Sequence, residues 1–174
     1  LTTVIASVET AEEKAKVLMA LGIDQSPEEL FTTDNWAAAE SGDEAAKATQ
    51  RVNQQVGLLL QTASTVVDDG DEATDVSVAV AGSVAEIISE AAVSDESVDL
   101  TSSETIATVL TEAIEEVAPE VEVDVEAITA VAESVATVNA VVADPALDPV
   151  SDVASDIIQS AQEDLQTSVA EVVK

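Results

Sequence analysis

Residues Ser41 to Val67 read SGDEAAKATQRVNQQVGLLLQTASTVV, and this stretch decides the fold. Ser41 or Asp43 is suited to cap the start of a helix. Apolar residues then recur mostly at steps of three and four, which places them on one face of an α-helix. They are Ala45, Ala48, Val52, Val56, Leu59, Leu60, Ala63 and either Val66 or Val67. At about 1.5 Å per residue this helix would be roughly 37 Å long, enough to cross a small domain.

Three amides, Asn53, Gln54 and Gln55, lie beside this apolar face. Asn139 lies on the apolar face of a later helix pattern, together with Val142. Because a buried amide without partners is costly, we expect Asn53 and Asn139 to bond to backbone ends or loops of neighbouring helices and so fix their register. The alternative is that the two form a polar pair that binds a ligand. Gln54 and Gln55 flank the stripe, and we expect them to face solvent.

The helical pattern continues on both sides of this stretch. A capping box at Thr10 and Glu13 starts one helix, and Gly22 is a natural stop after it. Alternating valines near Val76 would also suit a strand, but the later one-turn spacing favours helix. In all, the sequence predicts six to eight helices, four of them long. Short connections favour antiparallel neighbours, so we expect an all-α, up-and-down bundle that forms a single domain over residues 1–174.

The composition limits the classes of partner. The 174 residues include 36 Asp and Glu but only 5 Lys and Arg, a formal charge of −31. This charge disfavours nucleic acid and anionic membrane surfaces as ligands. It suits a saline medium or divalent cations, which screen self-repulsion. No uninterrupted apolar run reaches the length of a membrane span, so we expect no membrane insertion.

The chain contains no Cys and no His. Disulfides, thiolate metal sites and His-based acid–base pairs within the chain are therefore excluded. Carboxylate pairs such as Glu115 and Glu116 are too common here to indicate catalysis, which needs a carboxyl with a raised pKa in a dry cleft. We expect no enzymatic activity. The sequence starts at Leu1 rather than Met, which we take as the sign of a fragment or a processed product.

One acidic loop is a candidate for calcium. Its carboxylates are Asp68, Asp69, Asp71 and Glu72, around Gly70. The register of an EF-hand fails, because it would require oxygen ligands at positions occupied by valine. A solvated acidic turn is therefore the default interpretation of this loop, and a weak, irregular calcium site is the alternative. The same holds for Asp144 and Asp148. We expect no other cofactor.

Trp36 is the only tryptophan, and Phe31 is the only other aromatic residue. On a short helix near Phe31, Trp36 is expected to plug one end of the bundle. The alternative interpretation is that it is an exposed anchor for a partner protein.

Several short motifs resemble a helical module found between the repeated domains of very large bacterial surface and secreted proteins, which carry cadherin-like, immunoglobulin-like or calcium-binding RTX repeats. The motifs are Leu1-Thr2-Thr3, Leu21-Gly22-Ile23-Asp24, Leu30, Asp34, Gly42-Asp43-Glu44-Ala45-Ala46, Asn53, Val56, Val98-Asp99-Leu100-Thr101 and Val138-Asn139-Ala140. The chain departs at Asp34-Asn35-Trp36, where that module often has Asp-Pro. The resemblance implies an extracellular, modular and non-enzymatic part. It supplies no ligand and no catalytic residue.

These patterns lead to three hypotheses for function. The first is a structural or adhesive, adhesin-like module of a large secreted or cell-surface bacterial protein, which spaces, caps or joins neighbouring domains of its own chain or contacts surface partners. The second is a self-assembling subunit of an extracellular filament or surface layer, which packs through Ala and Val faces. The third is a helical enzyme or ligand carrier with a pocket near Asn53 and Asn139.

Overall fold

A computed structural model describes residues 1–67, 73–93, 98–117, 119 and 124–169. In these residues the only regular secondary structure is α-helix, so the predicted all-α class is confirmed. The helices are α1 (Thr2–Ser7), α2 (Ala11–Ala20), α3 (Pro27–Thr32), α4 (Asn35–Glu40), α5 (Glu44–Val67), α6 (Ala73–Val93), α7 (Ser103–Val117), α8 (Val125–Ala143) and α9 (Asp152–Val169). The described part thus has nine helices, of which the last five have 15 or more residues.

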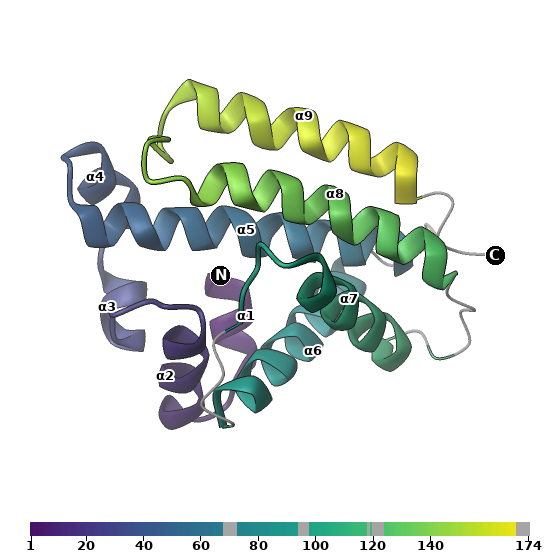
Figure 1. The fold of residues 1–174 in the computed structure, drawn as a ribbon. Helices are drawn as coiled ribbons and strands as arrows, with labels where there is room; N and C mark the ends of the chain where they lie inside the picture. The colour runs from purple at the N-terminus through teal and green to yellow at the C-terminus, as the bar shows by residue number, and fades with distance from the viewer. Residues whose placement is uncertain (68–72, 94–97, 118, 120–123, 170–174) are drawn as a thin grey trace.

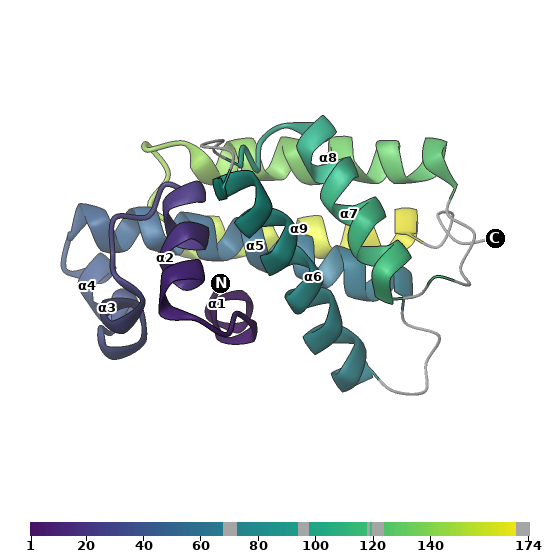
Figure 2. The same cartoon turned by 90° about the horizontal axis from the view of Figure 1, so that it is seen from below.

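Helix α5 is the centre of the arrangement. It contacts α4, α6, α7, α8 and α9. Figure 1 shows α8 and α9 lying alongside α5 as an antiparallel pair, with α1 to α4 gathered around the first half of α5. Helices α6 and α7 run obliquely to this group, as the turned view in Figure 2 also shows. The up-and-down arrangement therefore describes α5, α8 and α9 better than it describes the whole molecule.

The core of the described residues is aliphatic. Val56, Leu59 and Ala63 of α5 are fully buried, as their spacing predicts. At the start of α5 the buried residues are instead Ala46 and Thr49, one position after the predicted Ala45 and Ala48. At this end α5 contacts α4, and the hydroxyl of Thr49 bonds to Gln25 in the loop between α2 and α3.

The helix ends use the signals that the sequence contains. Thr10 with Glu13 and Ser26 with Glu29 form complete capping boxes at α2 and α3. Gly22 follows α2 with a φ of 70°, a left-handed conformation that favours glycine. Asp124 caps α8 by accepting hydrogen bonds from the backbone N–H groups of its first turn. These local contacts fix where the helices start and stop.

Two glycines lie inside helices without a packing reason. A Cβ placed on Gly57 of α5 or Gly82 of α6 meets no atom within 4 Å. Glycine in a helix interior costs roughly 0.5–1 kcal/mol relative to alanine. We therefore expect Gly57→Ala and Gly82→Ala each to raise the free energy of unfolding by about that amount, measured by urea denaturation.

Gly22 and Gly42 are the matched controls. Their φ angles are 70° and 95°, so alanine is strained there although the space is open. Gly22→Ala and Gly42→Ala should destabilise the protein. A loss of stability in Gly57→Ala would show that this surface of α5 is covered.

Candidate functional site

The buried side-chain amides of Gln55 and Asn139 connect three parts of the fold. Gln55 of α5 is buried, and its Nε2 donates a hydrogen bond of 3.1 Å to the backbone carbonyl of Asn139 in α8. The side chain of Asn139 is fully buried, and its Nδ2 donates 2.8 Å to the carbonyl of Leu100, just before α7. Each side-chain amide therefore donates a hydrogen bond to a backbone carbonyl of a neighbouring segment. The bonds tie α5, α8 and the start of α7 together.

The next polar residues of α5 hold the connection between α8 and α9. Gln54 donates from Nε2 to the carbonyl of Pro149 at 2.7 Å. Arg51 donates from Nη2 to the carbonyls of Pro145 and Leu147, both at 3.3 Å. We call Arg51, Gln54, Gln55 and Asn139 the polar seam. The expectation that Gln54 and Gln55 face solvent is wrong, because α8, α9 and their connection cover this side of α5.

Asn53 points to a different neighbour. Its residue is exposed, and its Oδ1 accepts a hydrogen bond of 3.2 Å from the nitrogen of Leu1. Asn53 and Asn139 thus bond to separate segments, Leu1 and Leu100, and these contacts do not bring them together as a polar pair.

A second amide network positions the short helices. Asn35 of α4 is buried, and its Oδ1 accepts 2.8 Å from the Nε2 of Gln25 in the loop between α2 and α3. The hydroxyl of Thr49 in α5 donates 3.1 Å to the Oε1 of the same Gln25. Gln25 therefore fastens α4 to α5. The sequence interpretation missed this network, since its three members are far apart in the chain.

Both aromatic residues lie at the surface. Trp36 is 44% exposed and Phe31 is 50% exposed. The sole methionine, Met19 of α2, is 75% exposed. Trp36 is therefore not a buried plug of the bundle, and a bundle core of aliphatic residues does without it.

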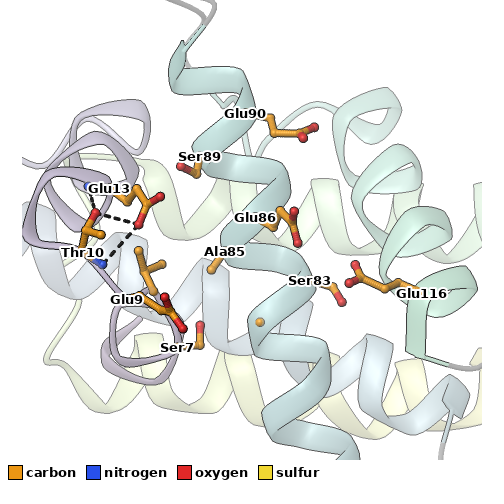
Figure 3. Close-up of a pocket in the computed structure, with 12 residues that line it drawn as sticks. Ser7, Glu9, Thr10, Glu13, Ser83, Ala85, Glu86, Ser89, Glu90 and Glu116 are labelled. Carbon is orange, nitrogen blue, oxygen red and sulfur yellow. Dashed lines mark hydrogen bonds between the residues drawn. The ribbon is translucent and has the colours of Figure 1, made fainter.

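A groove with a volume of about 830 Å³ runs along α6. Figure 3 shows α1 and α2 on one side of α6 and α7 on the other. Its walls carry five carboxylates, and the residues described as lining it include no Lys or Arg. The carboxyl group of Glu116 points from α7 toward Ser83 of α6. The residues that line the groove are Ser7, Val8, Glu9, Thr10, Glu13, Gly82, Ser83, Ala85, Glu86, Ser89, Glu90 and Glu116. Such a groove attracts cations.

Two smaller hollows adjoin each other along the loop between α2 and α3. Their volumes are about 340 Å³ and about 240 Å³. They share Gly22, Ile23, Asp24, Gln25 and Glu29. None of the three hollows is lined by Arg51, Gln54 or Asn139, so the polar seam is separate from them.

The carboxylates of the capping boxes have lowered pKa values. The carboxylate of Glu13 accepts two hydrogen bonds from Thr10, one of 2.7 Å from the hydroxyl and one of 3.2 Å from the backbone N–H. These bonds lower the pKa of Glu13 from 4.5. The pKa of Glu29 is lowered from 4.5 by the N–H and hydroxyl of Ser26. Since the folded pKa values are lower than the unfolded ones, this contribution to stability is present above about pH 4.5 and is lost as the pH falls through the lowered values.

We expect Thr10→Ala to raise the pKa of Glu13 toward 4.5, because it removes the hydroxyl that lowers it most. A carboxyl-detected NMR titration measures the change. The pKa of Glu29 should stay as it is in this variant, whereas Ser26→Ala should raise it and leave Glu13 alone. An unchanged Glu13 in Thr10→Ala would contradict the capping geometry.

Of the calcium candidates, the structure describes only Asp144 and Asp148. Asp68, Asp69, Asp71 and Glu72 lie outside the described residues. Asp144 accepts from the N–H of Ala146 at 2.8 Å, so it stabilises a local turn. Among the described residues, no three or more carboxylates are grouped closely enough to hold a metal ion.

Within the part of the chain that the structure describes, helix α8 is long and apolar enough to cross a membrane, with a mean hydropathy of 1.4. The absence of membrane insertion therefore stays a prediction. The composition is equally typical of a core helix. Helix α8 packs against α5, α7 and α9. Its buried residues are Ile128, Val131, Ala132, Val135, Ala136, Asn139 and Val142.

Comparison with family models, with curated proteins and with solved structures finds no match to this chain.

Proposed function

We propose that this chain is a structural or adhesive helical module of a large secreted or cell-surface bacterial protein, where it spaces or joins neighbouring domains. The observation that carries the proposal is the polar seam. Each of its four side chains donates at least one hydrogen bond to a backbone carbonyl of another segment. Polar groups used in this way hold helices in register, which is what a rigid connecting element needs.

The net charge supports the same proposal. A charge of −31 on 174 residues favours solubility in a saline medium and destabilises the compact state by self-repulsion. The acidic groove between α2 and α6 concentrates part of this charge. We propose that the module works outside the cell, where salt and divalent cations screen it, and that it does not insert into the membrane.

The parent gene tests the proposal. We expect it to encode tandem β-rich repeats beside this chain and a signal for export. A gene that encodes a compact cytosolic protein, without repeats and without an export route, would contradict it.

We expect the thermal midpoint to rise with ionic strength, since screening weakens the repulsion among 36 acidic residues. Circular dichroism in EDTA, in sodium chloride, in magnesium and in calcium at matched ionic strength measures this. A midpoint that does not change with salt would contradict the role given to charge. A midpoint that low calcium raises well beyond magnesium would identify a defined site, and Asp69→Asn and Asp71→Asn should then abolish the difference.

A specific observation favours one alternative, a self-assembling subunit of an extracellular filament or layer. Val141 of α8 and Val153 of α9 are 45% and 59% exposed, on two helices that pack against each other. Sedimentation velocity over a range of protein concentrations distinguishes the alternatives. Association that Val153→Ser abolishes would support the subunit, and a monomer at all concentrations supports the module.

A further inference from the structure

The two aromatic residues of the chain are held at the surface of one end of the molecule. Phe31 belongs to α3 and Trp36 to α4, which lie together near the start of α5 (Figure 1). The core cluster of the described residues consists of Ala, Val, Leu and Ile. Aromatic side chains bury more area than these, and they are enriched among the residues that dominate protein interfaces. The placement of both outside the core therefore points to an interaction surface.

The short helices that carry them are fixed in position. Helix α3 is held by its capping box and by the buried Leu30. Helix α4 is capped by Asp34, which accepts a hydrogen bond from the N–H of Ala37 at 3.0 Å, and it is fastened by the hydrogen bond that Gln25 donates to Asn35. A surface that is already ordered loses less entropy when it binds.

Each aromatic residue has a carboxylate one helical turn away. Glu28 is three residues before Phe31, and Glu40 is four residues after Trp36, spacings that place each pair on one helix face. Both glutamates are exposed. Residues 20–46 contain seven acidic residues and no Lys or Arg. An aromatic face beside a carboxylate suits a guanidinium group, which stacks on the ring and donates hydrogen bonds to the oxygens.

One peptide segment is long enough to contact both pairs. The Cα atoms of Phe31 and Trp36 are five residues apart, so they lie within about 18 Å of each other. Two hollows lie beside the loop between α2 and α3, and the exposed Met19 lines one of them. No Lys or Arg is among the residues described as lining these hollows.

We propose that Glu28, Phe31, Trp36 and Glu40, which we call the aromatic end, dock an arginine-bearing segment of a partner protein. A second copy of the chain fits poorly, because it would bring another charge of −31 against this surface. A divalent cation fits poorly as well, because calcium and magnesium take oxygen ligands and gain nothing from aromatic faces. This inference rests on the proposed function, since it names the chemistry of a partner that the module contacts.

Trp36 itself reports the binding. It is the only Trp, and the chain has no Tyr, so its fluorescence measures the environment of the aromatic end. The full chain is titrated with a short peptide of Arg, Leu and Ala, and with versions in which Lys or Gln replaces every Arg. We expect the Arg peptide to change the fluorescence and to bind more tightly than the Lys peptide, and the Gln peptide not to bind.

Calorimetry then gives the affinity of variants that lack the reporter. We expect Trp36→Ala to weaken binding of the Arg peptide about tenfold. Glu40→Gln should weaken it about threefold, since the ion pair is exposed. The matched controls are Val153→Ala on α9, with a side chain 59% exposed, and Glu126→Gln on α8, also exposed. Both should stay within about twofold of the unmodified chain.

If Trp36→Ala and Phe31→Ala bind the peptide as well as the two controls do, the attraction is spread over the acidic surface and the proposal is overturned. The four side chains of the aromatic end are exposed, so circular dichroism should show that every variant is folded. A parent gene without repeats would contradict the proposed function and would leave the peptide result unchanged. A failure of the peptide to bind would contradict the docking proposal and would leave the evidence from the parent gene unchanged. The two proposals can therefore fail separately.

Discussion

Leu59→Ala is expected to lower the free energy of unfolding by about 3–5 kcal/mol, the range for large-to-small changes at fully buried positions. The side chain of Leu59 has no exposed surface. It lies on α5, which contacts five other helices. Collapse around the cavity is limited, because helices α6, α7, α8 and α9 that contact α5 also contact other helices. Urea denaturation followed by circular dichroism measures the loss.

Leu60 is the matched control, since it has the same side chain on the same helix and is only partly buried. Leu60→Ala should cost clearly less than Leu59→Ala. If the two variants lose equal stability, α5 is not positioned as the fold requires.

Asn139→Asp is expected to lower the free energy of unfolding by about 3 kcal/mol or more at neutral pH. The two side chains have almost the same shape, so packing barely changes. The amide of Asn139 donates to the carbonyl of Leu100 at 2.8 Å within the core. A carboxylate cannot donate there. It would place a buried negative charge against an acceptor, without a cation among the contacts of Asn139 that the structure describes.

The loss should depend on pH. Burial raises the pKa of a carboxyl group at this position above its unfolded value. The destabilisation should therefore be smallest in acid and should grow as the pH rises through the range between the two values. Asn53→Asp is the control, because Asn53 is exposed and its oxygen accepts a hydrogen bond rather than donating one. A loss in Asn139→Asp no larger than in Asn53→Asp, or the same at every pH, would remove Asn139 from the core.

The sequence predicts well those features that depend on neighbours along the chain. The capping boxes at Thr10 and Ser26 join groups three residues apart, so the helix starts could be located without knowledge of the fold. The one-turn spacing of Val80, Val84 and Ile88 favoured helix over strand, and the structure has α6 there. Local spacing carries this information because the period of a helix is local.

Features that depend on which helices meet could not be predicted in the same way. Gln54 and Gln55 look like solvent-facing residues on one helix considered alone. They are covered because α8 and α9 approach that side of α5 from residues about 85–95 positions later, a distance for which the pattern of α5 holds no signal. The exposure of Trp36 is a similar case, since a short helix does not reveal which of its faces is packed.

The central claim is that this chain is a rigid module that spaces or joins neighbouring domains. It is tested most directly by small-angle X-ray scattering of the chain together with the domains that flank it in the parent protein. We expect one elongated particle with a fixed maximum dimension. Scattering from freely moving domains, or a parent protein that has no domains on either side of this chain, would contradict it.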